Sequence, residues 1–181
     1  MPNPSTITSS LSPEYALLGL LWQQPAHGYE LHQRLTTDLG QVWHISLSQT
    51  YNILNRLEAQ RLIAGTLQEQ AKLPARRQFR LTAAGRRRFE AWLHTPAGLS
   101  ARAIRVEFLT RLYFAQTVGV DDARAVIDAQ LAAIQSGLER LNAILVDLPE
   151  EQVFNRLGLD LRIRQLTSIL SWLEDCREAL S

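Results

Sequence analysis

The residues best suited to chemistry in this sequence lie in one polar segment, S-L-S-Q-T-Y-N-I-L-N-R-L-E at positions 46–58. Gln49, Asn52 and Arg56 follow one another at i, i+3 and i+7, which places them on one face of a helix. In the major groove of DNA, amide side chains pair with adenine and arginine pairs with guanine. The predicted base contacts are therefore Gln49, Thr50, Asn52 and Arg56.

A basic run follows this segment. From Lys72 to Arg88 the chain has seven Lys/Arg and no Asp/Glu. Such cations neutralise DNA phosphates whatever the base sequence. The polar stripe alone would also suit a solvated face of a small α+β domain, but the adjoining basic run favours nucleic acid. The predicted phosphate contacts are Ser48, Tyr51, Lys72, Arg76, Arg77 and Arg80.

The charge of the whole chain hides an asymmetry between its two halves. The formal net charge is +1 over 181 residues. Residues 1–97 have ten Lys/Arg against six Asp/Glu, whereas residues 98–181 have nine against twelve. The first half is thus the one that would meet a polyanion such as DNA.

Other kinds of functional site lack a recognisable pattern. His27, His32, His44 and His94 form no i, i+4 pair and have no cysteine near them in sequence, so neither a metal site nor a cofactor is expected. Patterns for Ser/His/Asp catalysis, phosphate-binding glycine loops and paired carboxylates are missing, which argues against an enzyme. The single cysteine, Cys176, lies among apolar residues at helical spacing. A structural thiol is the default, and redox sensing is the alternative.

Composition also bears on the compartment. The first ten residues, M-P-N-P-S-T-I-T-S-S, have no charged n-region and no apolar h-region of the kind found in signal peptides. No apolar stretch approaches the roughly 18 residues that a membrane span needs. We therefore expect a cytoplasmic protein without a membrane partner.

Three helices are predicted to position the polar segment. The first begins at Ser12-Pro13-Glu14 and is apolar nearly all round as far as Trp22, so it should be buried. The second runs from Gly28 to about Thr37. The third is the polar segment itself, with Ser48 as its N-terminal cap.

Two strands and a fourth helix come next. Residues 62–69 and 76–81 are the predicted strands, with a hairpin tip between them, and Thr82 caps a helix that continues through Leu93. Three helices followed by a two-stranded hairpin, within about 70 residues, is the layout of a winged helix-turn-helix DNA-binding domain.

The remainder is predicted to be helical, and its two last helices have a heptad pattern. Apolar residues between Asp121 and Pro149 are spaced alternately by four and three, as in a coiled-coil seam, and the last helix repeats this pattern. We interpret the seam as a dimerisation surface, with packing inside the chain as the alternative. The predicted dimerisation residues are Ile127, Leu131, Ile134, Leu138, Leu141, Leu145, Leu166, Leu170 and Leu173.

The predicted fold is therefore mainly α. Residues 1–11 form a flexible tail, residues 12–97 a winged helix-turn-helix (α+β) domain, and residues 98–181 an all-α dimerisation domain with long coiled-coil-like helices. The boundary is placed at Pro96-Ala97-Gly98, where turn-forming residues gather.

Three stretches, in order and at matching spacing, resemble the PadR family of transcriptional regulators. These are H-G-Y-E-L (27–31), the polar segment 46–58, and R-R-Q-F-R-L-T-A-A-G-R-R-R-F-E-A-W-L (76–93). The long helical remainder is similar to the dimerisation domain of the longer, Vir-like subgroup. The resemblance implies a homodimeric repressor that binds a pseudo-palindromic operator in double-stranded DNA and is released by a small-molecule effector.

Two positions depart from the pattern of the family. Many members have proline where this chain has Asn52, which adds a side chain for base contact. The polar segment 46–58 resembles the recognition helix of the family. Many members have glycine at the end of that helix, where this chain has Arg61. Because glycine accepts a left-handed backbone conformation at little cost, Arg61 must either take a different turn or bear strain.

Several further residues have two interpretations. In the 27–31 motif, we expect Tyr29 to pack and Glu30 to pair with a nearby cation, with a phosphate contact from His27 or Tyr29 as the alternative. An effector pocket could be lined by aromatic residues, which serve equally well as core: Trp22, Trp43, Tyr113, Phe114 and Trp172. An alternative function is that of a protein-interaction adaptor with a winged-helix fold that does not bind DNA.

Overall fold

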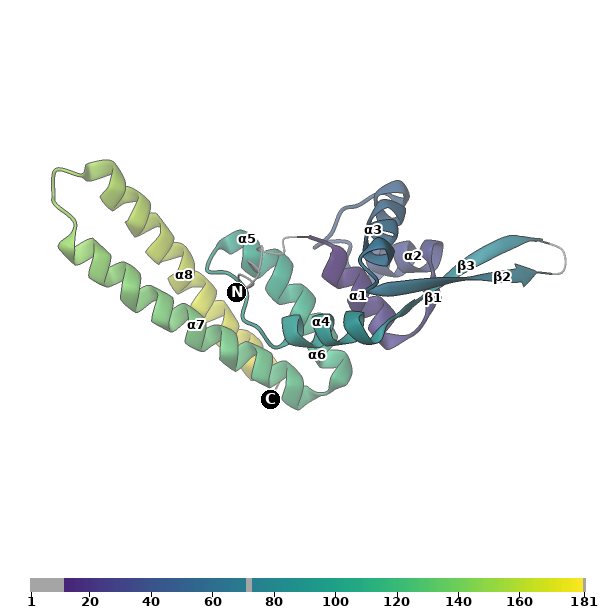
Figure 1. Ribbon diagram of the computed structural model, residues 1–181. Coiled ribbons are helices and arrows are strands. Elements are labelled where there is room, and N and C mark those ends of the chain that lie inside the picture. The colour runs from purple at the N-terminus through teal and green to yellow at the C-terminus, as the bar shows by residue number, and fades with distance from the viewer. Residues whose placement is uncertain (1–11, 71–72, 181) are drawn as a thin grey trace, which may run out of the picture. The chain divides into compact units, whose positions relative to one another are not determined.

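The computed structural model describes residues 12–70 and 73–180 (Figure 1). The chain divides into two compact units, residues 1–93 and 94–181. The predicted tail 1–11 and Lys72 lie outside the described residues. Most of the described chain is helical, with one small sheet in the first unit.

The first unit is built around α1 (Glu14–Gln23). Residues Ala16 to Leu21 are all buried, as the apolar sequence of this helix predicts. Helices α2 (Gly28–Leu39), α3 (Leu47–Ala59) and α4 (Ala83–Leu93) all pack against it. This central helix thus supplies the core on which the polar segment, now α3, is mounted.

The start of α3 differs from the prediction. Its cap is Ser46, whose Oγ accepts a hydrogen bond from the backbone N–H of Gln49 at 3.2 Å. The Gln49 Oε1 accepts in return from the Ser46 N–H at 2.8 Å. The predicted cap, Ser48, is wrong, because this reciprocal capping box satisfies two N–H groups at once and begins the helix earlier.

The end of α3 has the left-handed residue that its sequence suggested. Arg61 has φ 58° and is the one non-glycine residue with positive φ in the described chain. Its N–H donates to the carbonyl of Glu58, and the N–H of Leu62 donates to that of Leu57. These two bonds form a Schellman motif, in which glycine usually takes the place that Arg61 has here.

The two-stranded hairpin, which we call the wing, is longer than predicted, and a third strand joins its sheet. β2 (Ile63–Gln70) pairs antiparallel with β3 (Leu73–Leu81), and β1 (Ala26–His27) pairs with the other edge of β3. The predicted hairpin tip therefore continues as strand up to the undescribed residues 71–72. A two-residue strand has no periodicity of its own, so β1 could not be recognised before its partner was placed.

After the wing, α4 returns the chain to the core. The Thr82 Oγ1 accepts from the N–H of Gly85 at 3.1 Å, which confirms the predicted cap. Trp92 stacks on Tyr15 at a centroid distance of 4.6 Å, and Phe89 lies 5.8 Å from Trp22. Trp22 therefore packs in the core of this unit.

The second unit consists of helices. The predicted helix 102–118 is present as α5 (Ala101–Ala103), a π-helical turn η1 (Ile104–Phe108) and α6 (Leu109–Val118). Two long helices follow, α7 (Val120–Asp147) and α8 (Val153–Ala179), which lie side by side as a hairpin (Figure 1). No helix in the described ranges is long and apolar enough to cross a membrane.

The heptad seam packs within its own chain. Ile127 and Ile134 are fully buried, and α7 contacts both α6 and α8 of the same chain. Leu166 and Leu173 of α8 are buried as well. The short link from α7 to α8 thus supplies a partner helix locally, but Leu138, Leu145 and Leu170 are only half-buried, so a surface between two copies along this seam stays a prediction.

Apolar residues are exposed instead at the end of the hairpin where α7 passes into α8. Val146 and Phe154 have exposed fractions of 83 and 88 %. Four more apolar side chains near this end, Ile144, Val153, Leu157 and Leu161, are about half exposed. We call this set the hairpin-end patch: Ile144, Val146, Val153, Phe154, Leu157 and Leu161.

Polar groups are also buried in this unit. The amide of Gln130 bonds both backbone groups of Ala97, accepting from its N–H at 2.6 Å and donating to its carbonyl at 3.3 Å. Glu107 and Arg111 form a buried ion pair at 3.3 Å. Phe114 is fully buried, and Phe108 meets Trp172 edge to face at 5.9 Å. Phe108 and Phe114 therefore serve as core, whereas Trp172 remains 39 % exposed.

Candidate nucleic-acid interface

The exposed face of α3 presents amide and guanidinium groups. Gln49, Asn52 and Arg56 are exposed, as the helical spacing predicts. Asn55 is exposed one position before Arg56 and is not among the predicted base contacts. Its i+3 spacing from Asn52 is the signal that could have found it. A helix of this kind offers the hydrogen-bonding groups that base edges require.

Thr50 does not belong to that face. Its side chain is fully buried. The Thr50 hydroxyl donates to the carbonyl of Ser46 at 3.1 Å, and His32 Nδ1 lies 3.1 Å from the Thr50 Oγ1. This geometry does not support a base contact by Thr50, because the residue holds the first turn of α3 against α2.

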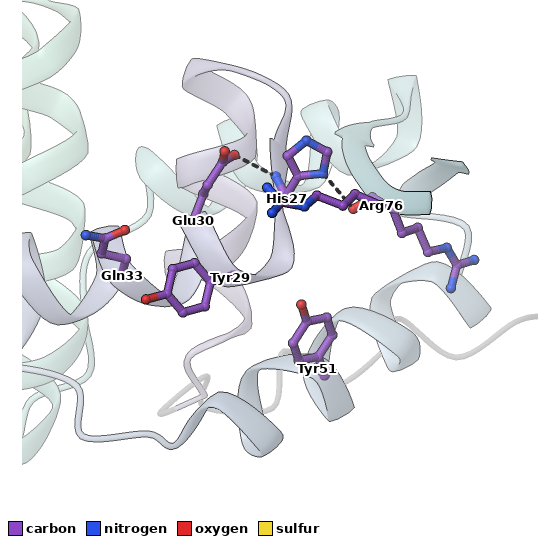
Figure 2. A pocket seen from close by; sticks show the side chains of 7 residues that line it. His27, Tyr29, Glu30, Gln33, Tyr51 and Arg76 are labelled. Atoms are coloured by element: carbon purple, nitrogen blue, oxygen red, sulfur yellow. Dashed lines mark hydrogen bonds between the residues drawn. The ribbon is translucent and has the colours of Figure 1, made fainter. Parts of the chain in front are cut away.

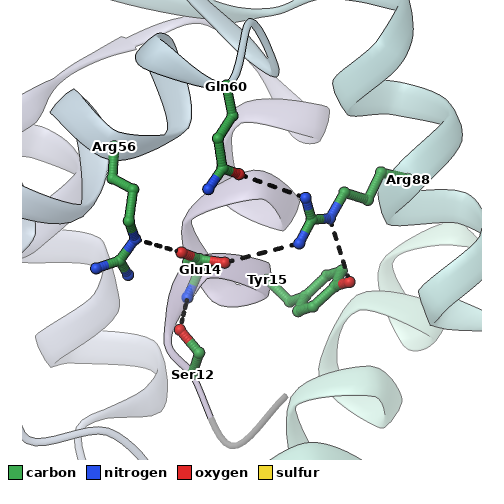
Figure 3. Close-up of polar contacts among 6 residues, drawn as sticks. All are labelled: Ser12, Glu14, Tyr15, Arg56, Gln60 and Arg88. Carbon is green, nitrogen blue, oxygen red and sulfur yellow. Dashed lines mark hydrogen bonds and ion pairs between the residues drawn. The ribbon is translucent and has the colours of Figure 1, made fainter. Parts of the chain in front are cut away.

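Arg56 is held by a carboxylate from α1. Its Nε donates to Glu14 Oε1 at 2.6 Å, while the other carboxylate oxygen lies 3.9 Å from Arg88 Nη2 (Figure 3). Arg88 also donates to the Tyr15 hydroxyl at 3.3 Å. Both arginines thus share one acid, a contact that local sequence patterns could not predict because Glu14 and Arg56 are 42 positions apart.

The wing arginines fall into two groups. Arg77 is paired, with Nη2 at 2.7 Å from the Glu58 carboxylate, and its guanidinium lies over the Phe79 ring. Arg76 and Arg80 are exposed, and the described residues provide no ion-pair partner for either. These two cations are therefore available to a phosphate.

A cleft of about 580 Å³ lies between the start of α2, α3 and β3 (Figure 2). Tyr29 is 60 % exposed here, so the prediction that it packs is wrong. The Tyr51 ring is 40 % exposed at the same cleft. Lining residues contribute aromatic, amide and charged groups: His27, Tyr29, Glu30, Gln33, Tyr51, Arg76 and Arg77.

Two local contacts shape this cleft. A Cβ at Gly28 would come within 2.5 Å of the Tyr51 ring, so glycine is what lets the ring lie against the start of α2. Glu30 Oε2 accepts from the backbone N–H of His27 at 2.9 Å. Glu30 therefore caps α2, rather than pairing with a cation as predicted.

Comparison with known proteins agrees with this architecture. Residues 17–91 match the transcriptional regulator PadR-like family, and residues 104–181 match the family described as virulence activator alpha C-term. The negative transcriptional regulator PadR of Bacillus subtilis is 25 % identical over 172 residues, covering 89 % of this chain and 93 % of that protein.

Two solved structures of this Bacillus subtilis protein also match the chain over most of its length. A crystal structure of Bacillus subtilis PadR with operator DNA is 24 % identical and covers 93 % of this chain and 98 % of that chain, with a TM-score of 0.44. The same protein with p-coumaric acid is 23 % identical at the same coverages, with a TM-score of 0.40.

These matches fall on both units. The first family covers α1 to α4 with the wing, where the exposed face of α3 lies, and the second covers the helices from η1 to α8. The chain is thus a PadR-like transcriptional regulator of the longer form, in which a winged-helix domain is followed by a C-terminal helical domain of the virulence activator alpha type.

Proposed function

We propose that this regulator is a cytoplasmic protein that binds a specific DNA sequence, with α3 in the major groove. The observation that carries the proposal is the exposed row of Gln49, Asn52 and Arg56 on α3, together with two exposed wing cations, Arg76 and Arg80, for which the described residues provide no ion-pair partner. The first set offers hydrogen bonds to base edges. The second offers charge to phosphates without regard to sequence.

The cleft between α3 and the wing is the proposed seat of the DNA backbone. A helix in the major groove and a neighbouring wing must have a phosphate strand between them. Tyr51 and Arg76 line the cleft from either side and would contact that strand, with Tyr29 next to them. Exposed tyrosine hydroxyls are common donors to phosphate oxygens.

We propose further that the protein acts as a homodimer. One winged-helix domain has few phosphate contacts, and two related half-sites about one helical turn apart would convert weak binding into avid binding. Much of the heptad seam is buried within the chain, so we place the dimer surface at the exposed hairpin-end patch. Exposed apolar patches of this kind mark protein interfaces.

The sign of regulation is proposed to be negative. The Bacillus subtilis relative is a negative regulator, and it also forms a complex with p-coumaric acid. We extend these properties to the present chain only in general form, as repression of transcription and release from DNA by a small organic effector.

Binding of the purified protein to the DNA upstream of its own gene tests the proposal. The comparison is scrambled DNA of equal length, across a salt series. A specificity ratio above roughly 10³ at physiological salt supports a sequence-specific regulator. Weak and equal binding to both duplexes, repeated with a genomic library of fragments, would instead support an adaptor that no longer binds DNA.

A further inference from the structure

The carboxylate of Glu14 belongs to α1, which is not one of the elements proposed to meet DNA. It sits in the first turn of α1, whose following residues are buried, so its position is fixed by the core. Its side chain is only 13 % exposed. From there it reaches Arg56 on α3 and Arg88 on α4 (Figure 3).

The contact with Arg56 uses one particular atom. Nε donates to Glu14 Oε1 at 2.6 Å, and the described residues provide no partner for the two Nη atoms. Those Nη groups form the end of the guanidinium fork. A pair of parallel N–H donors at this end matches the O6 and N7 acceptors of guanine.

Stability does not explain this ion pair. The Arg56 side chain is 52 % exposed, and ion pairs in such surroundings contribute little to the free energy of unfolding. What the contact does is remove rotational freedom from a long side chain. Ordering that side chain before DNA arrives lowers the entropy cost of a base contact.

We infer that Glu14 is a positioning residue that sets the direction of the Arg56 guanidinium and thereby determines base preference. The inference rests on the proposed DNA-binding function. It extends the recognition surface to α1, a helix that would not touch DNA. Arg88, held by Tyr15 and Gln60, fixes the second oxygen of the same carboxylate.

Loss of the Glu14 carboxylate should raise the affinity for scrambled DNA but lower the ratio of specific to scrambled binding, a combination that misfolding would not produce. Glu14→Gln removes a negative charge near the DNA, so affinity for scrambled DNA should rise. The freed Arg56 should discriminate less well, so the ratio of specific to scrambled binding should fall about tenfold, within the range for one bidentate base contact. A partly unfolded variant would lose affinity for both duplexes.

Glu90→Gln is the matched control. Glu90 lies in the same unit, 3.6 Å from Arg86, and has no contact with Arg56. Removing its charge should raise binding to both duplexes and leave their ratio unchanged. In an Arg56→Ala background, Glu14→Gln should no longer alter the ratio, because the group that it positions is gone.

The experiment measures binding of the full chain to the selected operator, to operators with each single base pair changed, and to scrambled DNA. The inference is overturned if the ratio of specific to scrambled binding is the same in Glu14→Gln as in Glu90→Gln. It is also overturned if the ratio is higher in Glu14→Gln, because Glu14 would then compete with the base for Arg56. If the wild-type protein itself prefers no sequence, the proposed function fails instead, so the two failures are distinguishable.

Discussion

The Nη2 atom of Arg77 lies 2.7 Å from each of the two carboxylate oxygens of Glu58. The Glu58 Oε1 also accepts from the backbone N–H of Gly65 at 2.9 Å. These contacts tie the last turn of α3 to both long strands of the wing. One of the predicted phosphate contacts, Arg77, is therefore already paired with a carboxylate of the same chain.

Wing arginines should consequently differ in their effect on DNA binding. Arg80→Gln should lower the slope of log K against log salt by about one, because an unpaired cation releases a full counterion on binding. Arg77→Gln should change the slope much less, since Glu58 already balances its charge. Titrations of both variants between low and physiological salt measure this, and equal slopes would contradict the distinction.

The left-handed residue after α3 should cost stability. Arg61→Gly should raise the free energy of unfolding by about 0.5–1 kcal/mol, since relief of a left-handed conformation outweighs the extra freedom of glycine in the unfolded chain. Arg61→Ala is the control, because it removes the side chain but keeps the strain. Urea denaturation midpoints of the two variants should differ, and a stabilised alanine variant would argue against backbone strain.

The buried pair Glu107–Arg111 should be intolerant of single changes. The two side chains are 6 and 4 % exposed, so Glu107→Ala leaves a buried cation without its acid. We expect a loss of about 3–5 kcal/mol in unfolding free energy. Replacing both at once, by Glu107→Met with Arg111→Leu, should restore most of it. A double variant as unstable as the single one would show that other partners of Arg111 dominate.

The hairpin-end patch should control the oligomeric state. Phe154→Asp should weaken self-association because it places a charge on an exposed apolar surface, while the fold of the chain stays intact. Gln135→Asp, an exposed change elsewhere on α7, is the control. Sedimentation velocity over a concentration series measures both. A Phe154→Asp protein that associates as the wild type does would remove this patch from the dimer surface.

Cys176 should react slowly with alkylating agents near neutral pH. Burial raises the pKa of its thiol, and the neighbouring Asp175 raises it further. A raised pKa leaves less thiolate at a given pH, so alkylation should be slower than for a free cysteine and should accelerate only as the solution becomes alkaline. Asp175→Asn should speed the reaction. Rapid alkylation at pH 7 would instead support the alternative interpretation of Cys176 as a redox sensor.

Local patterns in the sequence determined much of this protein. The capping hydroxyl of Thr82, the apolar α1 and the polar face of α3 depend on residues within a few positions of one another, and all three were predicted. The PadR-like resemblance rested on the same local motifs and is confirmed by the family matches at 17–91 and 104–181. Such features are readable because helix periodicity and caps are set by near neighbours.

Tertiary structure decided which of the predicted side chains are available to contact DNA or a second chain. Thr50 has the right spacing for α3 yet is buried, and Arg77 has the right charge yet is paired with Glu58. The heptad seam has the right period, but a heptad does not state whether its partner is another chain or the next helix. Burial and ion pairing join residues distant in sequence, as between Glu14 and Arg56, so only the folded chain determines them.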